Sequence, residues 1–141
     1  MTVLSDFSEE LLLEYLFTTI AAADRPTTWW LSLHTDAPGE TGVDNEMDTD
    51  DDADYTGAVR PEIEFTKLAN NSVDNDDNIT YSTTDGTASV AITHIGIWGG
   101  AAGETVGTGT YLAGGALDGT RTLTSTAPFT IAAGDLVIAL N

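Results

Sequence analysis

Hydrophobic residues near the amino terminus are spaced as in a helix. The apolar set comprises Leu11, Leu12, Leu13, Tyr15, Leu16, Phe17 and Ile20. Asp6 and Glu9 precede this set as a capping-box-like pair, and Pro26 cannot continue a helix. We therefore predict one amino-terminal α-helix within residues 1–24, capped by Asp6. Because apolar side chains surround most of this helix, it needs more than one packing partner.

From residue 28 the hydrophobic period changes to two, which is typical of strands. Short strands are predicted at residues 28–34, 59–65, 79–81, 90–98, 106–112, 120–124, 129–131 and 136–140. Turns rich in glycine separate most of them. In the strand at 90–98, alternation places Ile95 and Ile97 on the opposite face from Val90, Ile92 and Trp98. The whole series predicts a mainly β fold: an antiparallel, jelly-roll-like β-sandwich with one amino-terminal helix.

Two of these strands carry more specific predictions. The strand at 28–34 is expected to be half-buried, with Trp29, Leu31 and Leu33 on one face and Trp30, Ser32 and His34 on the other. Pro61 lacks an N–H group, so the strand at 59–65 is expected at a sheet edge. No repeat or linker divides the chain. We therefore expect one domain over residues 1–141, with an acidic loop inserted at residues 36–57.

Charge is the unusual property of this composition. The 141 residues include 23 Asp and Glu against 4 Lys and Arg, for a formal net charge of -19. So few basic residues argue against nucleic acid and against anionic membranes as partners. The absence of cysteine excludes disulfides. Self-repulsion at this charge is screened by molar salt, which predicts a protein that works in a halophile's cytoplasm or in brine.

Part of the acidic loop resembles a divalent-cation site. Calcium or magnesium would be the ion, and the alternating carboxylates are Asp48, Asp50, Asp52 and Asp54. A helix-loop-helix calcium loop needs glycine at its sixth position and an acid at its twelfth, and Ala53 and Val59 stand there. A solvated acidic loop without an ion is the alternative. No other cofactor is predicted.

Candidate catalytic groups are few. Ser32, His34 and Asp36 could be read as a nucleophile and its base, but strand spacing is expected to keep these side chains about 7 Å apart on one face. His34 and His94 could bind a metal with Asp36, or be ordinary hydrogen-bonded strand residues. Lys67, the only lysine, has no recognisable activating partner. We therefore predict that the protein is not an enzyme.

Tryptophan gives one candidate for ligand contact. Trp29, Trp30 and Trp98 could present aromatic faces to a carbohydrate ring. Alternation along the strands instead places Trp29 and Trp98 in the core. Trp30 is then the remaining candidate for binding.

Five segments of the chain follow one another in a recognisable order. They are the helix at 11–20, WLSLHTDAPGETG at 30–42, the strand region 55–65, THIGIW at 93–98 and AAGDLVIAL at 132–140. In this order the chain resembles a family of small virion proteins of tailed viruses, generally labelled tail fibre or minor structural proteins. That family has a short Gly/Ser turn where this chain has residues 43–54, and Asp-Ala is usual at Gly99-Gly100. The resemblance implies no enzymatic activity.

These observations predict a non-enzymatic structural protein of the virion, assembled in the host cytoplasm. Its partners would be copies of itself and other virion proteins, such as the major capsid protein or tail proteins. The short chain favours a capsid decoration or turret protein in many symmetric copies. The alternative is a tail-tip, baseplate or tail-fibre component that binds a host receptor or glycan. The predicted contact residues are Leu12, Leu13, Leu16, Phe17 and Trp30.

Overall fold

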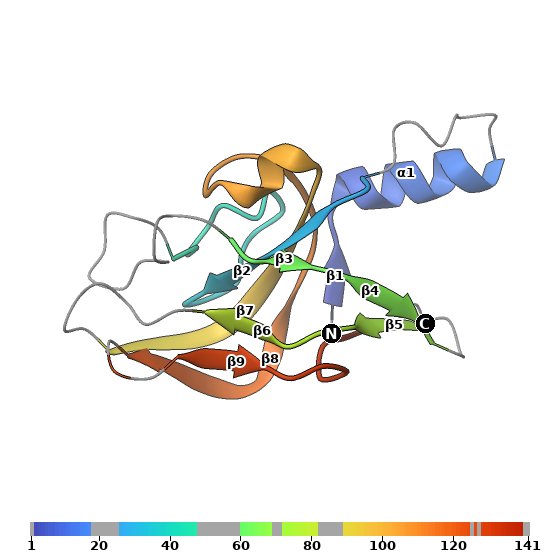
Figure 1. Ribbon diagram of the computed structural model, residues 1–141. Helices are drawn as coiled ribbons and strands as arrows, with labels where there is room; N and C mark the ends of the chain where they lie inside the picture. Colours follow the sequence, from blue (N-terminus) through green and yellow to red (C-terminus); the bar gives the residue numbers. More distant parts are fainter. Residues whose placement is uncertain are drawn as a thin grey trace.

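The computed structural model describes residues 2–17, 26–47, 60–68, 72–81, 89–124, 126 and 128–139, and most of its elements are strands (Figure 1). In chain order the elements are β1 (Thr2–Leu4), α1 (Asp6–Phe17), β2 (Trp29–His34), β3 (Glu62–Ile63), β4 (Phe65–Lys67), β5 (Ser72–Asn75), β6 (Ile79–Tyr81), β7 (Ser89–Gly99), the 3-10 helix η2 (Ala101–Glu104), β8 (Thr110–Thr124), β9 (Phe129–Ile131) and β10 (Val137–Ala139). Every strand pairing among them is antiparallel. The prediction of a mainly β, antiparallel protein is confirmed, whereas the jelly-roll sandwich stays a prediction.

The largest sheet has five strands in the order β1-β8-β7-β2-β3. β2 pairs with β7 along its whole length, from Trp29 opposite Gly99 to His34 opposite His94. β3 follows Pro61 and forms one edge of this sheet, as expected for a strand beside a proline. The long strands β7 and β8 cross the middle of the molecule, and the other elements are arranged around them (Figure 1).

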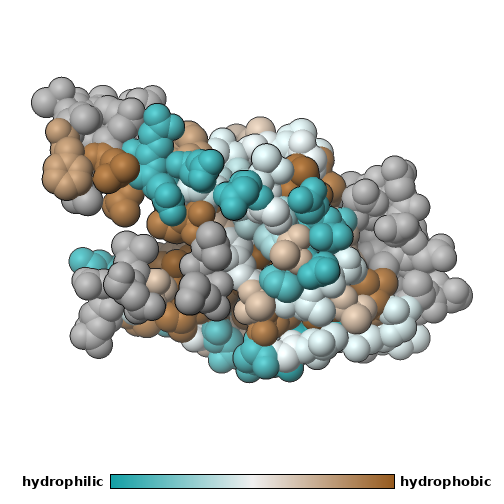
Figure 2. All heavy atoms as spheres, turned by 180° about the vertical axis from the view of Figure 1, so that it is seen from behind, coloured by the Kyte–Doolittle hydropathy of each residue, from teal (hydrophilic) through white to brown (hydrophobic). Residues whose placement is uncertain are grey.

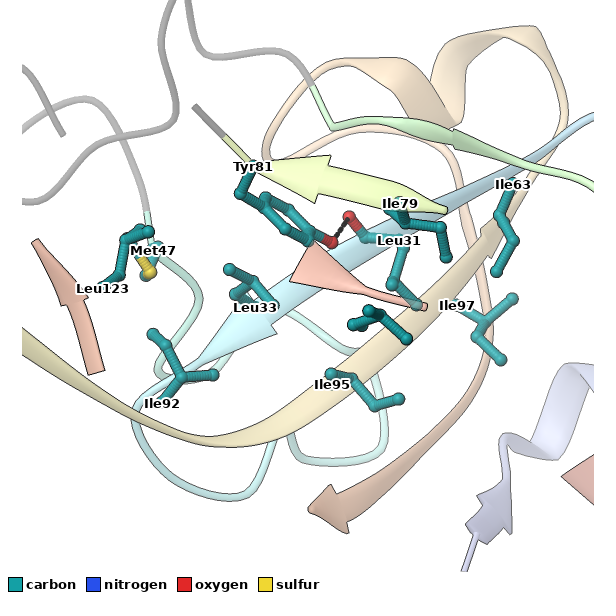
Figure 3. Packing of buried hydrophobic residues seen from close by; sticks show 11 residues of the cluster. Leu31, Leu33, Met47, Ile63, Ile79, Tyr81, Ile92, Ile95, Ile97 and Leu123 are labelled. Carbon is teal, nitrogen blue, oxygen red and sulfur yellow. Dashed lines mark hydrogen bonds between the residues drawn. The ribbon is translucent and has the colours of Figure 1, made fainter. Parts of the chain in front are cut away.

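The hydrophobic core lies on one face of this sheet. Side chains from β2 and β7 meet side chains from β6 and β9, which form a separate two-stranded sheet (Figure 3). The buried members are Leu31, Leu33, Met47, Ile63, Ile79, Tyr81, Ile92, Ile95, Ile97, Leu123 and Ile131. The Tyr81 hydroxyl donates to the Leu31 carbonyl at 2.8 Å, so β6 is tied to β2 by a polar contact within the core. A third sheet has the order β10-β5-β4.

An irregularity in the pairing of β7 with β8 accompanies a correction to the predicted facing of Val90 and Ile92. The register between β7 and β8 shifts just after Ile92. Such a shift turns the later side chains to the other face of the sheet. Val90 and Ile92 therefore pack in the same core as Ile95 and Ile97, while Trp98 lies on the opposite face.

The second face of β2 is also covered, so the half-buried strand was a wrong prediction. Leu31, Ser32, Leu33 and His34 are all 0% exposed. The chain returns across this face after β2, and Glu46 forms an isolated bridge with His34. The alternation of polar and apolar residues could not reveal this burial. Polar side chains can be buried where a loop packs on the strand and provides their hydrogen-bond partners.

Other element boundaries also differ from prediction. β1 and β5 were not predicted, because three and four residues are too few for a periodic signal. The strands expected at 106–112 and 120–124 are one strand, β8, in which residues 117–120 bulge opposite Thr93 alone. The acidic loop is described only as far as Met47, and residues 48–59 lie outside the described residues.

Helix α1 begins one residue before the predicted start, with a different cap. The Ser5 hydroxyl oxygen accepts the Ser8 N–H at 3.3 Å, and the Ser5 carbonyl accepts the Glu9 N–H at 3.0 Å. Asp6 is therefore the first helical residue rather than the cap. The Ser8 hydroxyl donates to the Leu112 carbonyl at 2.7 Å, which fixes the start of the helix on β8. The predicted continuation to residue 23 lies outside the described residues.

Candidate functional site

The α1 patch is the exposed apolar surface of the amino-terminal helix, and it is formed by Phe7, Leu12, Leu13 and Phe17. Phe17 is 79% exposed and Leu13 is 59% exposed. The helix projects from the sheets, and its apolar atoms are visible on the projecting part in Figure 2. Leu12, Leu13 and Phe17 were predicted contact residues and all three are exposed; the side chain of Leu16 lies outside the described part. Among the described residues, no helix is long and apolar enough to cross a bilayer.

The three tryptophans do not share one surface. The Trp30 indole is half-buried and donates from Nε1 to the Gly100 carbonyl at 2.9 Å. Trp29 packs edge-on against Phe65 beside the core, with ring centroids 6.3 Å apart. Trp98 is 2% exposed on the opposite face of the sheet. The indole N–H of Trp30 is therefore anchored to the backbone, and its role as a contact residue stays a prediction.

Ser32 and His34 touch each other, which corrects the predicted separation of their side chains. The Ser32 hydroxyl donates to His34 Nε2 at 2.7 Å and accepts the Trp98 Nε1–H at 2.8 Å. His34 Nδ1 lies 2.9 Å from the Asp44 carbonyl, which can only accept, so Nδ1 carries the proton. The Asp36 carboxylate is exposed and accepts the Ala37 N–H at 2.8 Å. The three residues predicted as a possible triad are therefore not brought together.

Burial is the main reason that the pKa of His34 falls to about 4, from its ordinary value of 6.5. The positive charge of Arg60 and the neighbouring His94 lower this pKa further. His34 is consequently neutral at neutral pH, which matches the tautomer set by its hydrogen bonds. Both of its ring nitrogens are engaged, so it cannot act as the predicted metal ligand without breaking this chain.

The remaining candidate metal ligands are His94, Asp36 and the carboxylates of the acidic loop. Among the described residues no group of three or more His, Asp or Glu side chains is placed to hold a metal ion. The acidic loop ligands Asp48, Asp50, Asp52 and Asp54 lie outside the described residues. His94 Nδ1 lies 2.8 Å from the Thr93 hydroxyl, and that hydroxyl donates to the Thr35 carbonyl at 2.8 Å. His94 Nδ1 must then be the donor, which leaves Nε2 as a hydrogen-bond acceptor.

Arg60 is the buried polar residue that the sequence analysis missed. It is 0% exposed, and its Nε and Nη2 donate to the two carboxylate oxygens of Glu46 at 2.6 and 2.7 Å. Its Nη1 donates to the carbonyls of Gly103, Thr105 and Thr108. A bidentate pair of this kind fixes geometry strongly. Arg60 therefore joins the loop after β2 to the loop around η2.

A cavity of about 410 Å³ lies between residues 37–40 and β8, and we call it the β8 cavity. Its lining residues are Leu4, Ser5, Ala37, Pro38, Gly39, Glu40, His94, Tyr111, Gly114, Gly115 and Ala116. A second cavity of about 460 Å³ lies between β8 and the strands β9 and β10. Core side chains such as Ile95 and Phe129 line part of that second cavity, and the charged residues Asp118, Arg121 and Asp135 line another part.

Tyr111 is a buried side chain of the β8 cavity, at 8% exposed. Its ring packs against Trp98 with centroids 5.3 Å apart. Its hydroxyl forms no hydrogen bond to any residue that the structure describes. Burial, followed by the nearby charge of Glu40, raises the pKa of Tyr111 to about 12. Periodicity and motifs could not indicate this site, because residues 40, 94 and 111 come together only through the fold.

Comparison with known proteins adds the family. No curated protein matches the chain. Residues 3–139 match the family described as Gp80, podophage GP4 fiber I protein gp80. This match covers both the helix and the strands, and it agrees with the predicted resemblance to structural proteins of tailed-virus particles. The chain therefore belongs to the Gp80 podophage fiber protein family.

Proposed function

We propose that this protein is a non-enzymatic component of the virus particle that attaches to copies of itself or to other particle proteins through the α1 patch. The exposed apolar side chains of Phe17 and Leu13 are the observation that carries this proposal. A contiguous apolar surface of this kind usually marks a protein contact. The start of the helix is bonded to β8, so a contact made by α1 would be transmitted directly to the main sheet.

The place of the protein in the particle has two candidates. The family description names a fiber protein, which favours a tail fibre or another tail component. A capsid decoration protein in many copies is the competing location, predicted from the short chain. Quantitative mass spectrometry of purified particles separates them, because hundreds of copies per particle would favour the capsid and a handful would favour the tail.

The attachment role is tested with charge substitutions on the α1 patch. We expect the double variant Leu13→Glu, Phe17→Glu to fold normally, because both side chains are largely exposed, and to lose incorporation into particles. Val137→Glu is the matched control, because Val137 is an exposed apolar residue on β10, at 48% exposure. Circular dichroism verifies folding, and particle composition is measured after complementation. Normal incorporation of the double variant would contradict the proposal.

We also propose that the protein works at high salt. The support is its formal net charge of -19 with only one lysine. Repulsion between so many carboxylates weakens the compact state in dilute buffer and is screened over a few ångströms in molar salt. Assembly in the host cytoplasm belongs to the same proposal, since some archaeal and bacterial halophiles keep molar salt there.

A further inference from the structure

The Tyr111 hydroxyl is a buried hydrogen-bond donor that no described residue pairs with. Tyr111 is 8% exposed and lines the β8 cavity, yet its hydroxyl has no hydrogen-bond partner among the described residues. A Cβ atom added at Gly114, which also lines this cavity, would collide with the hydroxyl oxygen. A glycine at that position therefore leaves room for the hydroxyl to reach the cavity. A buried polar group without a partner calls for a water or a ligand to satisfy it.

Two acceptors border the same cavity. The Glu40 carboxylate is exposed and has no hydrogen-bond or ion-pair partner in the described part of the chain. The Nε2 atom of His94 is a second acceptor, because Nδ1 of that ring donates to Thr93. Between these groups the wall is apolar or lacks side chains, and it includes Leu4, Pro38 and Ala116. Apolar walls with a few placed polar groups are typical of small-molecule sites of this volume.

We propose that the β8 cavity binds one neutral, polyhydroxylated ring, of the chemical class of a hexopyranose. A sugar hydroxyl both accepts and donates. One such group can accept from Tyr111, and others can donate to the Glu40 carboxylate and to His94. The apolar face of the ring can rest on Pro38 and Ala116. This site goes beyond the attachment role of α1, because none of the α1 patch residues lines the cavity and binding a sugar needs no second protein.

Other ligand classes satisfy the cavity less well. An anion would be repelled by Glu40 and by the formal net charge of -19. An ammonium group can donate to Glu40 and His94 but cannot accept from the Tyr111 hydroxyl. A phenolate ligand for a metal ion is disfavoured, because the pKa of Tyr111 is raised to about 12. A neutral polyol is the class that pairs all three groups.

Binding is tested by titrating the full chain, with backbone amides followed by NMR. The probes are D-glucose, D-galactose and D-mannose, each as the free sugar and as the methyl glycoside. Free sugars and glycosides distinguish a soluble hexose from the end of a glycan chain. We expect amide shifts confined to residues 37–40 and 113–116. Glucuronate is the anionic probe, and tighter binding of glucuronate than of glucose would overturn the proposal, as would the absence of cavity shifts with every hexose.

Two variants locate the site. Tyr111→Phe removes only the hydroxyl and should weaken hexose binding about three- to tenfold, the effect of losing one hydrogen bond. Ala116→Phe places a ring in the cavity from an exposed position and should abolish binding without unfolding the protein. Unchanged binding in both variants would show that hexoses bind elsewhere.

A stability measurement tests the premise independently. Because the Tyr111 hydroxyl has no partner among the described residues, Tyr111→Phe should leave the melting temperature unchanged or raise it. Tyr81→Phe is the matched control, since the Tyr81 hydroxyl donates to Leu31, and it should lower the melting temperature. A clear loss of stability in Tyr111→Phe would show a protein partner and overturn the proposal. None of these results depends on particle incorporation, so they separate this site from the role of α1.

Discussion

The guanidinium carbon of Arg60 lies 3.8 Å from the centre of the Trp98 ring. The same guanidinium is paired with Glu46 and bonded to three carbonyls around η2, so the contact is both a stack and a hydrogen-bonded clamp. A cation over an indole gains energy when it is shielded from water, and Arg60 is 0% exposed. This face of the sheet is therefore held by an aromatic and ionic cluster rather than by aliphatic packing.

Replacing Arg60 should destabilise the protein severely. In Arg60→Met the Glu46 carboxylate, 3% exposed, loses its counter-ion and stays buried. Removing one partner of a buried pair costs about 3–5 kcal/mol. Arg121→Met is the control, because Arg121 pairs with Asp118 on the surface and such pairs contribute about 0–1 kcal/mol. Urea denaturation of both variants measures the difference, and equal losses would contradict the assignment of Arg60 as a structural clamp.

Stability should fall as the pH drops from 6.5 toward 4. The pKa of His34 is about 4 in the folded protein and takes its ordinary value of 6.5 in the unfolded chain. Between these two values the unfolded chain binds a proton that the folded chain does not. The contribution is present above pH 6.5 and decreases by up to about 3 kcal/mol on reaching pH 4. Denaturant titrations of the wild type and of His34→Gln measure the difference in pH dependence. A His34 resonance that titrates near 6.5 in the folded protein would contradict this prediction.

Gly96 should not tolerate a side chain. A Cβ at this position would collide with the Ser32 hydroxyl and His34 Nε2, the two atoms of the buried hydrogen bond. We expect Gly96→Ala to cost about 1–3 kcal/mol, as for other overpacked sites. Gly119→Ala is the control, because the nearest atom to its added Cβ is Arg121 Nη1 at 3.6 Å. Thermal melts compare the two, and a harmless Gly96→Ala would mean that the Ser32-His34 contact is loose.

Salt should raise the melting temperature. At about 1 M salt the Debye length is near 3 Å, so repulsion among the carboxylates of a chain with net charge -19 is largely removed. Melts in sodium chloride are compared with melts in sucrose at matched osmolality, since sucrose stabilises proteins without screening charge. A melting temperature that does not change with salt, or that rises equally in sucrose, would end the proposal of a high-salt environment.

The positions of the main strands were predictable from periodicity. The contacts between residues distant in the sequence were not. β2 and β7 carry strong alternation, and both were placed within a residue or two. The side of the sheet that Ile92 faces was predicted wrongly, because a bulge shifts the strand register without changing the composition. The role of Arg60 could not be predicted from the sequence. It depends on contacts with Glu46 and with the carbonyls around η2, which approach Arg60 only in the folded chain. Tyr111 likewise reads as one more strand residue until Gly114 and Glu40 are placed beside it.

The attachment of α1 to the sheet has a mechanical consequence. β1 pairs with residues 113–115 of β8, and the Ser5 hydroxyl donates to the Tyr111 carbonyl at 2.7 Å. A pulling force on the helix is therefore distributed over several hydrogen bonds, which must break together. The 15-residue β8 then spreads the tension into β7. A protein attached through this helix, as we propose, can therefore bear a mechanical load while its sheets stay intact.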